Sequence, residues 1–363
     1  MGLEMNKRHV LRSLLCAMAA LPATVCAAPL DALLTADQYH HAGEFRAEAG
    51  YDAMNDTLDV LGIRAKDPLY AGTNVGDYSG LHLRLGYALT DRLLLEGGAW
   101  RRKISYRSDN EALDSWQVAG QYRIWGDENS KTHFALRLSA WGDQASTLAK
   151  STPTLVSGQT LNSVTINSPR DNQVQADAIG TWRLTRRASL SAFVGAGRSR
   201  VSTGDMSANY TDGNGCNYNL AFTATGTSVR LAAPCGDLLA AFVTTPQNML
   251  QEFSYQASYY QLGGMWQWQN HNWSVRGGYQ FQRLQRANVD ALIASSGGVP
   301  YQSNHIVVAE AMRKVATHVA VFARGQVMSN QFVGEIPFAY NSATASKFAR
   351  RYGYASLGVV MGF

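Results

Sequence analysis

The residues of this chain that could do chemistry are mainly arginines, which lie on the polar side of segments that alternate between apolar and polar residues. Six arginines share this position: Arg84, Arg123, Arg137, Arg183, Arg276 and Arg324. Three acidic residues, Glu96, Asp177 and Glu310, lie on the same polar side. A guanidinium binds carboxylate in a bidentate manner, so arginines in excess around a common interior would attract anionic solutes. The alternative is that the arginines and acids pair with one another and fill that interior. The sequence leaves both interpretations open.

Residues for hydrolysis are sparse. Ser303 and His305 share one face of a short segment, and Asn55-Asp56-Thr57 with His82 or His305 is a second candidate group. A nucleophile needs a base within hydrogen-bond reach and a third group that orients the base. Neither group meets that requirement by sequence alone, so an enzyme acting on lipid or lipopolysaccharide is kept as an alternative.

Cofactor and metal chemistry have weak support. Asp212, Asn214 and Asn217 resemble a calcium loop but have no glutamate at its twelfth position. His40-His41 supplies two ligands, which do not make a metal site. We therefore predict no cofactor, no metal and no nucleic-acid partner.

The N-terminus has the features of a secretory signal peptide. Lys7, Arg8 and Arg12 precede a short apolar run, and Val25-Cys26-Ala27 offers a cleavage site. We predict a signal peptide over 1–27 and a short periplasmic leader over 28–42. Removing 1–27 leaves a formal charge of 29 − 26 = +3 and two cysteines, Cys216 and Cys235, which we expect to form a disulfide.

The elements that must position the arginines are strands. Only 16% of the 363 residues are charged while 46% are hydrophobic, which excludes intrinsic disorder. Apolar and polar residues alternate with period two over segments of about ten residues, as in strands with two different faces. The alternation predicts twelve strands, over 43–54, 79–89, 92–106, 113–125, 133–147, 171–184, 188–202, 252–269, 273–286, 304–314, 317–329 and 349–363.

The connections between these strands alternate between short and long. Links such as 90–92, 185–187 and 270–272 are tight, whereas 55–78, 148–170, 203–251, 287–303 and 330–348 are long. An even number of strands with this alternation is typical of a transmembrane barrel. We predict an all-β fold for 43–363: a 12-stranded antiparallel transmembrane β-barrel with short periplasmic turns and long extracellular loops.

Two further features support a membrane barrel over a soluble β-sandwich. Tryptophan and tyrosine lie near strand ends, as in interfacial aromatic girdles: Trp116, Trp125, Trp182, Trp266, Trp268, Trp273, Tyr106 and Tyr122. The chain ends Leu357, Val359, Met361, Phe363, which resembles the C-terminal assembly signal of Gram-negative outer-membrane barrel proteins. The resemblance implies an outer-membrane location and recognition of Phe363 by the barrel-assembly machinery.

Basic residues cluster where strands would emerge on the long-loop side. The cluster comprises Arg101, Arg102, Lys103, Arg198, Arg200, Arg350 and Arg351. Lipopolysaccharide phosphates in the outer leaflet give such a rim an electrostatic role. The alternative is ordinary flanking charge.

The longest connection, 203–251, holds both cysteines and an apolar stretch over 237–243 that should need burial. One hypothesis is that it folds across the outer mouth and narrows it. The other is that it lies outside the barrel and packs on neighbouring loops.

Together these features favour an outer-membrane channel for small solutes with a mild preference for anions. A closed structural or adhesive barrel that acts through its loops is an alternative, as is the enzyme.

Overall fold

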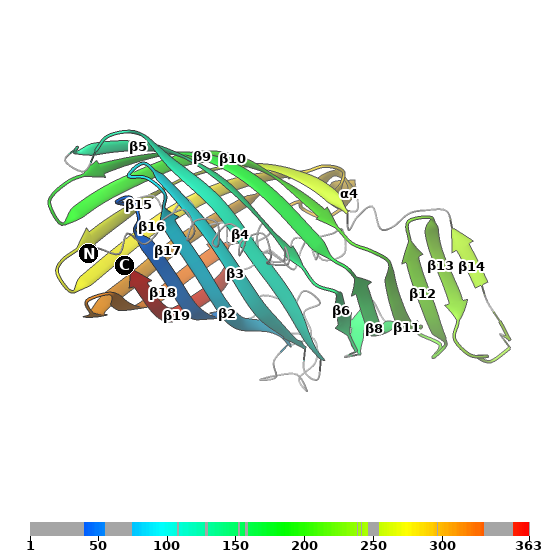
Figure 1. Cartoon of the computed structure of the whole chain (residues 1–363). Helices are drawn as coiled ribbons and strands as arrows, with labels where there is room; N and C mark the ends of the chain where they lie inside the picture. The colour runs from blue at the N-terminus through cyan, green and yellow to red at the C-terminus, as the bar shows by residue number, and fades with distance from the viewer. Residues whose placement is uncertain are drawn as a thin grey trace, which may run out of the picture.

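The computed structural model describes residues 40–54, 75–106, 109–127, 130–151, 153–156, 159–237, 239–240, 242–245, 254–295, 297–329 and 351–362. Twelve antiparallel strands form a closed barrel (Figure 1). In chain order they are β1 (Phe45–Met54), β2 (Val75–Ala88), β3 (Leu93–Tyr106), β4 (Asp109–Trp125), β5 (Thr132–Gln144), β9 (Arg170–Arg183), β10 (Ala188–Ser202), β15 (Tyr255–Gln269), β16 (Trp273–Arg286), β17 (Ser303–Ala316), β18 (Val319–Ser329) and β19 (Arg351–Gly362).

The barrel closes where the first strand meets the last. β1 pairs with β19 in antiparallel register, with Ala49 opposite Val359. Every other neighbouring pair is also antiparallel, so no backbone edge of the barrel is left unpaired. Closure removes the exposed edge that an open sheet would present to lipid.

The burial pattern is the reverse of that in a soluble protein. On β5, Leu138 is 67% exposed and points outward, while its neighbour Arg137 is fully buried and points inward. The same alternation puts Leu81, Leu83 and Leu85 outside and His82 inside. An apolar exterior around a polar interior is the pattern that a hydrocarbon environment favours.

An aromatic band surrounds the short-turn end of this apolar exterior. Trp125 and Phe134 have ring centroids 5.7 Å apart, and Phe134 and Trp182 meet edge to face at 6.5 Å. Trp266 and Trp273 are also outward and about half-exposed. The predicted aromatic girdle therefore exists at this end.

The twelve predicted strands correspond one to one with the barrel strands, and most bounds agree within a few residues. Two strands begin earlier than predicted: β2 at Val75 and β4 at Asp109. Their first residues, Val75-Gly76-Asp77 and Asp109-Asn110-Glu111, contain a single apolar side chain, so the apolar alternation was too weak to mark them.

Two of the long connections are not irregular loops. They contain β6 (Thr147–Lys150), β7 (Thr154–Val156), β8 (Gln159–Asn167), β11 (Met206–Thr211), β12 (Asn217–Thr223), β13 (Gly226–Leu231) and β14 (Phe242–Thr245). These strands form a second sheet that projects from the barrel end opposite to the marked N and C positions (Figure 1).

The projecting sheet continues the register of the barrel. Gln144 pairs with Arg170 in the barrel, and Thr147 pairs with Asn167 in the projecting sheet, so one hairpin runs through both. The described residues of 203–251 extend away from the barrel (Figure 1), so the hypothesis that they narrow the outer mouth is wrong. The expectation of burial for 237–243 is also wrong, because Leu239, Phe242 and Val243 are 80%, 68% and 60% exposed.

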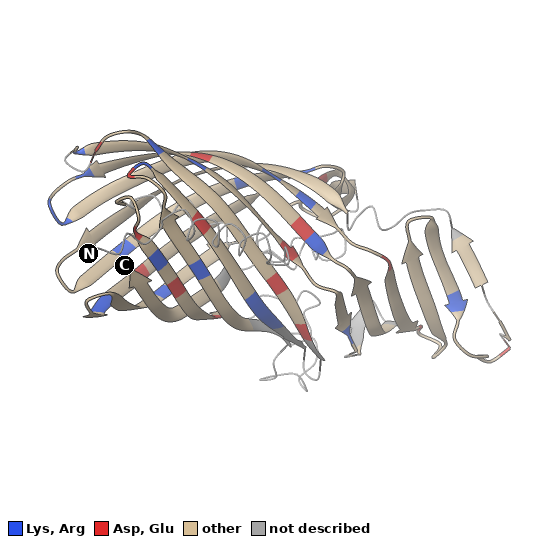
Figure 2. Ribbon diagram, in the orientation of Figure 1, with Lys and Arg blue, Asp and Glu red and all other residues tan. Residues whose placement is uncertain are grey.

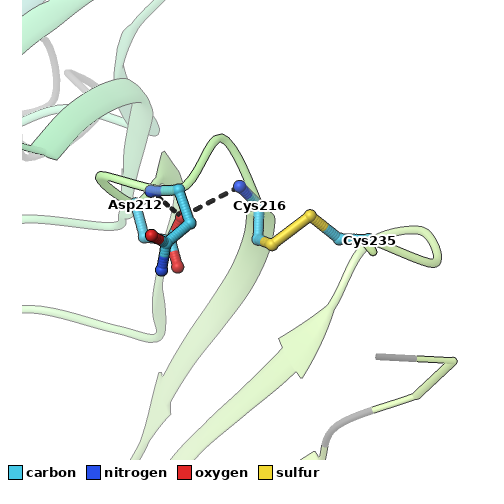
Figure 3. Close-up of a disulfide and its surroundings, with 4 residues drawn as sticks. Asp212, Cys216 and Cys235 are labelled. Carbon is cyan, nitrogen blue, oxygen red and sulfur yellow. Dashed lines mark hydrogen bonds between the residues drawn. A yellow bond between two sulfur atoms is a disulfide. The ribbon is translucent and has the colours of Figure 1, made fainter. Parts of the chain in front are cut away.

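The predicted disulfide is present in the projecting sheet. Cys216 and Cys235 are bonded, with 5.5 Å between their Cα atoms and a sequence separation of 19 (Figure 3). Asp212 accepts a hydrogen bond from the Cys216 backbone N–H at 2.9 Å and closes the turn before the disulfide. The disulfide therefore clamps the ends of the β12–β13 hairpin.

The connection after β16 contains a short helix that the sequence did not suggest. α4 (Val289–Ser295) buries Val289 and Ile293. Asp290 in its first turn accepts hydrogen bonds from the Arg286 backbone and guanidinium at 3.0 and 3.2 Å. Among the described residues, no helix is long and apolar enough to cross a membrane.

Candidate functional site

The nine predicted lumen residues lie on the polar, inward side of the barrel strands. Eight of them lie on seven strands, β2, β4, β5, β9, β16, β17 and β18, and Glu96 lies on β3. Arg137, Asp177, Arg276, Glu310 and Arg324 are buried. Acidic and basic residues are interspersed along the barrel strands and sparse in the projecting sheet (Figure 2).

A chain of ion pairs runs across the inner wall from β16 to β1. Arg276 contacts Glu310 at 2.8 Å, Glu310 contacts Arg324 at 2.7 Å, and Arg324 contacts Glu48 at 3.0 Å. All four side chains are less than a tenth exposed. Because β18 and β1 flank β19, the Arg324–Glu48 contact reaches across the last strand to the first.

The chain of ion pairs continues into a cluster of acid, histidine and hydroxyl groups. His82 Nδ1 lies 2.9 Å from Asp52, and His82 Nε2 lies 3.4 Å from Glu48. Ser356 on β19 donates its hydroxyl to Asp52 at 2.5 Å. Gly50, opposite His82 in register, makes room for the ring, because a Cβ there would be 2.5 Å from His82 Cε1.

A second group of ion pairs lies on β2, β3 and β5. Arg137 contacts Glu96 at 2.5 Å, and Arg84 lies 3.8 Å from Glu96 and 4.0 Å from Glu48. Four of the six predicted arginines therefore pair with carboxylates. This is the pairing alternative that the sequence left open.

Asp177 belongs to a network of amides. It accepts hydrogen bonds from Gln175 at 2.7 Å and from Gln261 at 2.9 Å, and Gln280 in turn donates to Gln261 at 3.0 Å. Tyr259 donates to Gln175 at 3.0 Å. These amides were not predicted as site residues, although they lie on the polar side of the same alternation.

The remaining two predicted arginines, Arg123 and Arg183, line a cavity at the short-turn end of the barrel. This mouth cavity has a volume of about 650 Å³. Arg46 on β1, Arg92 in the β2–β3 turn, and Arg186 and Arg187 in the β9–β10 turn also line it. Its described lining holds six arginines against three carboxylates, Glu44, Asp91 and Glu96.

The charge around the mouth cavity is uneven. The three carboxylates come from the residue before β1, from β3 and from the β2–β3 turn. Arg123, Arg183, Arg186 and Arg187 come from β4, β9 and the β9–β10 turn. We call these four residues the four-arginine wall. The side formed by β15 to β19 contributes uncharged residues such as Gln267, Gln269 and Met312. His40 also lines the cavity, and burial lowers its pKa despite the opposing effect of Glu96, so at neutral pH it adds no charge to the cavity.

Two features of the sequence pointed to the mouth cavity, but nothing in the sequence connects them. Arg186 and Arg187 form an adjacent basic pair in a tight turn, and Arg92 ends another tight turn on the same side. The cavity could not be predicted because it depends on which turns lie beside one another around the barrel.

The predicted basic rim divides into three parts. Arg101, Lys103, Arg198 and Arg200 are outward and exposed. Arg102 is inward and 1% exposed, with its guanidinium 6.0 Å from the Trp100 ring, so its assignment to the outer rim is wrong. Alternation requires this, because Arg101 and Arg102 must point to opposite faces. Arg350, Phe363 and the side chain of Arg351 lie outside what the structure describes, as do the predicted signal peptide and most of the leader.

The hydrolytic candidates that the structure describes are not assembled into a catalytic site. His305 is outward, and its Nδ1 lies 2.7 Å from the Tyr279 hydroxyl on the barrel exterior. His82 is engaged by two carboxylates, and Asn55-Asp56-Thr57 lies outside the described residues. No group of three or more potential metal ligands occurs in the described part of the chain.

A closed antiparallel barrel with an apolar exterior, an aromatic girdle and a charged interior defines the class: this chain is a β-barrel protein of the outer-membrane type. No family model and no curated protein matches the sequence.

Among solved structures, the chain is similar to the CymD monoaromatic hydrocarbon channel, at 12% identity over 95% of this chain and 96% of that one, with a TM-score of 0.37. It is similar to the NanC porin at 8% identity, over 87% and 98%, with a TM-score of 0.38. It is also similar to the translocator domain of the autotransporter NalP from Neisseria meningitidis at 10% identity, over 98% and 99%, with a TM-score of 0.47. These proteins differ in what they do, so function is argued from the residues of this chain.

Proposed function

We propose that this protein is a channel for small solutes in the outer membrane of a Gram-negative bacterium, with a mild preference for anions. The observation that carries the proposal is the mouth cavity, whose described lining holds six arginines and three carboxylates. A cationic entrance raises the local concentration of anions and lowers that of cations.

The anion preference is assigned to the mouth cavity rather than to the middle of the barrel. Arg137, Arg276 and Arg324 are buried and paired with carboxylates, so their charges are largely compensated. The described lining of the mouth cavity instead holds six arginines against three carboxylates, and the four-arginine wall supplies four of those arginines. A solute entering from the short-turn end would therefore meet net positive charge.

The test is planar-bilayer conductance of the refolded protein, with the reversal potential measured under a KCl gradient. We expect stable openings with chloride preference, and a smaller preference in the Arg186→Gln/Arg187→Gln double variant. Arg313→Gln is the matched control, because Arg313 is an exposed cation at the same end that contacts Trp273 and does not line the cavity. Cation preference in the unaltered protein would contradict the assigned role of the arginines.

A closed barrel that acts through its projecting sheet is the second candidate. It is favoured by the complete burial of inward side chains such as Arg137, Gln261 and Gln280. Water-filled lumens leave such side chains exposed. Absence of conductance from well-folded protein would contradict the channel and favour this candidate.

We also propose that the outward basic residues contact lipopolysaccharide. Arg198 and Arg200 are exposed on the outer face of β10, beyond the apolar residues Leu190 and Val194. Arginines just beyond the apolar part of the strand would lie beside the phosphates of an outer leaflet and could donate hydrogen bonds to them. The same outer-membrane location implies folding by the barrel-assembly machinery, with Phe363 as its proposed signal.

The lipopolysaccharide proposal predicts weaker binding when these charges are removed. We expect the Arg198→Gln/Arg200→Gln variant to retain less lipopolysaccharide on co-purification, because each lost guanidinium removes charge-assisted hydrogen bonds to phosphate. Lipopolysaccharide per folded barrel measures the effect, and Arg313→Gln at the opposite end is the control. Equal retention by all three proteins would contradict the assignment.

A further inference from the structure

The mouth cavity has the size of a binding site for a small organic molecule. Its volume is about 650 Å³, and ligand sites in proteins typically occupy roughly 300 to 1,000 Å³. Polar and apolar groups both line it: Gln121 and Thr181 lie on the inner wall with Ile179, Leu94 and Ala135. Such a lining suits a ligand with charged groups on a compact carbon skeleton.

The arginines of the cavity are placed on one side. Arg123 lies two residues before the end of β4 and Arg183 ends β9, while Arg186 and Arg187 follow in the next turn. Two strands and one turn thus bring four guanidinium groups to a single wall. Guanidinium groups bind carboxylate and phosphate oxygens through paired hydrogen bonds.

The rest of the cavity lining does not offer a second arginine wall. β15 and β17 contribute the uncharged Gln267, Gln269 and Met312, and the carboxylates of Glu44 and Asp91 lie toward β1 and β2. Because Arg46 and Arg92 accompany those carboxylates, the charge on that side is mixed, and an anion would be attracted more strongly to the four-arginine wall. A ligand would therefore be oriented, with its anionic groups toward β4 and β9.

We infer that the four-arginine wall of the mouth cavity binds a small organic solute that carries at least two anionic groups, either carboxylates or phosphates. The inference deepens the proposed function and rests on it, because a small-solute channel is what brings such a solute to this cavity. A single anionic group would engage only part of the wall, so monoanions bind more weakly.

Isothermal titration of the refolded full-length protein with citrate tests the inference, with pyrophosphate and acetate as comparison probes. We expect citrate or pyrophosphate to bind at least about tenfold more tightly than acetate, and binding to weaken as KCl screens the charges. Citrate and pyrophosphate together distinguish carboxylate from phosphate as the preferred group. Equal affinity for acetate, or no binding by folded protein, would overturn the inference.

Two double variants locate the site. Arg123→Gln/Arg183→Gln and Arg186→Gln/Arg187→Gln should each weaken binding by about tenfold or more, since each removes two guanidinium groups that donate charge-assisted hydrogen bonds to the anion. Arg186 and Arg187 are exposed turn residues, so the second variant should fold even where the first does not. Arg313→Gln should bind as the unaltered protein does. Unchanged binding in both double variants would overturn the site.

The titration tests the anion site and the conductance measurement tests the channel, so either proposal can be contradicted without the other. Binding without conductance would keep the anion site and contradict the channel. Conductance without binding would keep the channel and overturn the anion site.

Discussion

Replacing Arg324 with methionine is expected to destabilise the folded barrel by about 3 to 5 kcal/mol, because removing one member of a buried ion pair leaves an uncompensated charge. Arg324 lies between Glu48 and Glu310, at 3.0 and 2.7 Å, and all three side chains are buried. Its removal leaves Glu310 with Arg276, but Glu48 loses its shortest cationic contact. The free energy of unfolding can be measured by urea titration in lipid, followed by tryptophan fluorescence.

A second variant separates the charge effect from a packing defect. In Arg324→Met/Glu48→Gln the carboxylate of Glu48 is gone, so part of the lost stability should return. Arg313→Gln, which changes an exposed arginine of β17, should shift the unfolding free energy by no more than about 1 kcal/mol. A double variant as unstable as the sum of its single variants would contradict the coupling of these two residues.

The location of this ion-pair chain explains why the expected effect is large. Glu48 and Asp52 lie on β1, Ser356 lies on β19, and Arg324 lies on β18. Their contacts therefore cross the junction between the first and last strands, which must meet for the barrel to close. Stability at this junction comes from side chains that are far apart in the sequence.

Removal of the disulfide is expected to have the second largest effect, confined to the projecting sheet. Cys216 and Cys235 close a loop of 19 residues, and the chain-entropy model assigns about 3 kcal/mol to such a loop. In Cys216→Ser/Cys235→Ser, backbone amides of β12 and β13 should therefore exchange hydrogen roughly a hundredfold faster. Hydrogen exchange with mass spectrometry measures this directly.

The barrel provides an internal control for that experiment. Strands β3, β4 and β16 have no contact with the disulfide hairpin in the sheet order, so their amides should exchange at unchanged rates. Unchanged protection of β12 and β13 would mean that sheet pairing alone holds the hairpin. Faster exchange throughout the barrel would contradict the expected confinement to the projecting sheet.

Two groups in the projecting sheet illustrate how it differs from the barrel. Tyr210 and Tyr218 stack across β11 and β12, with ring centroids 5.1 Å apart, and burial raises the pKa of Tyr210. Asn162, Asn209 and Asn219 form a ladder of side-chain hydrogen bonds at 2.7 and 2.8 Å. These polar and aromatic contacts lack the regular apolar alternation that marks the barrel strands, which is why the sequence did not predict this sheet.

The sequence by itself determined the number of barrel strands and which side chains face inward. Residues such as Leu136, Arg137 and Leu138 alternate, and in a strand consecutive side chains must point to opposite faces. The same rule places Arg102 inward, because it lies two residues after Trp100 on the same strand. The prediction of an outer rim did not apply the rule to this cluster. The two cysteines that remain outside the predicted signal peptide likewise determined the disulfide pair.

Only the tertiary structure decided how the charged residues are combined. Strand alternation places Arg324 and Glu48 on the inward side, but their sequence separation of 276 residues gives no indication that they meet. The distances between charged side chains are set by barrel closure, by strand register and by which turns lie beside one another, and each of these depends on the whole chain. The same holds for the mouth cavity. Its arginines can be read from the sequence, but only the folded barrel brings four of them to one wall.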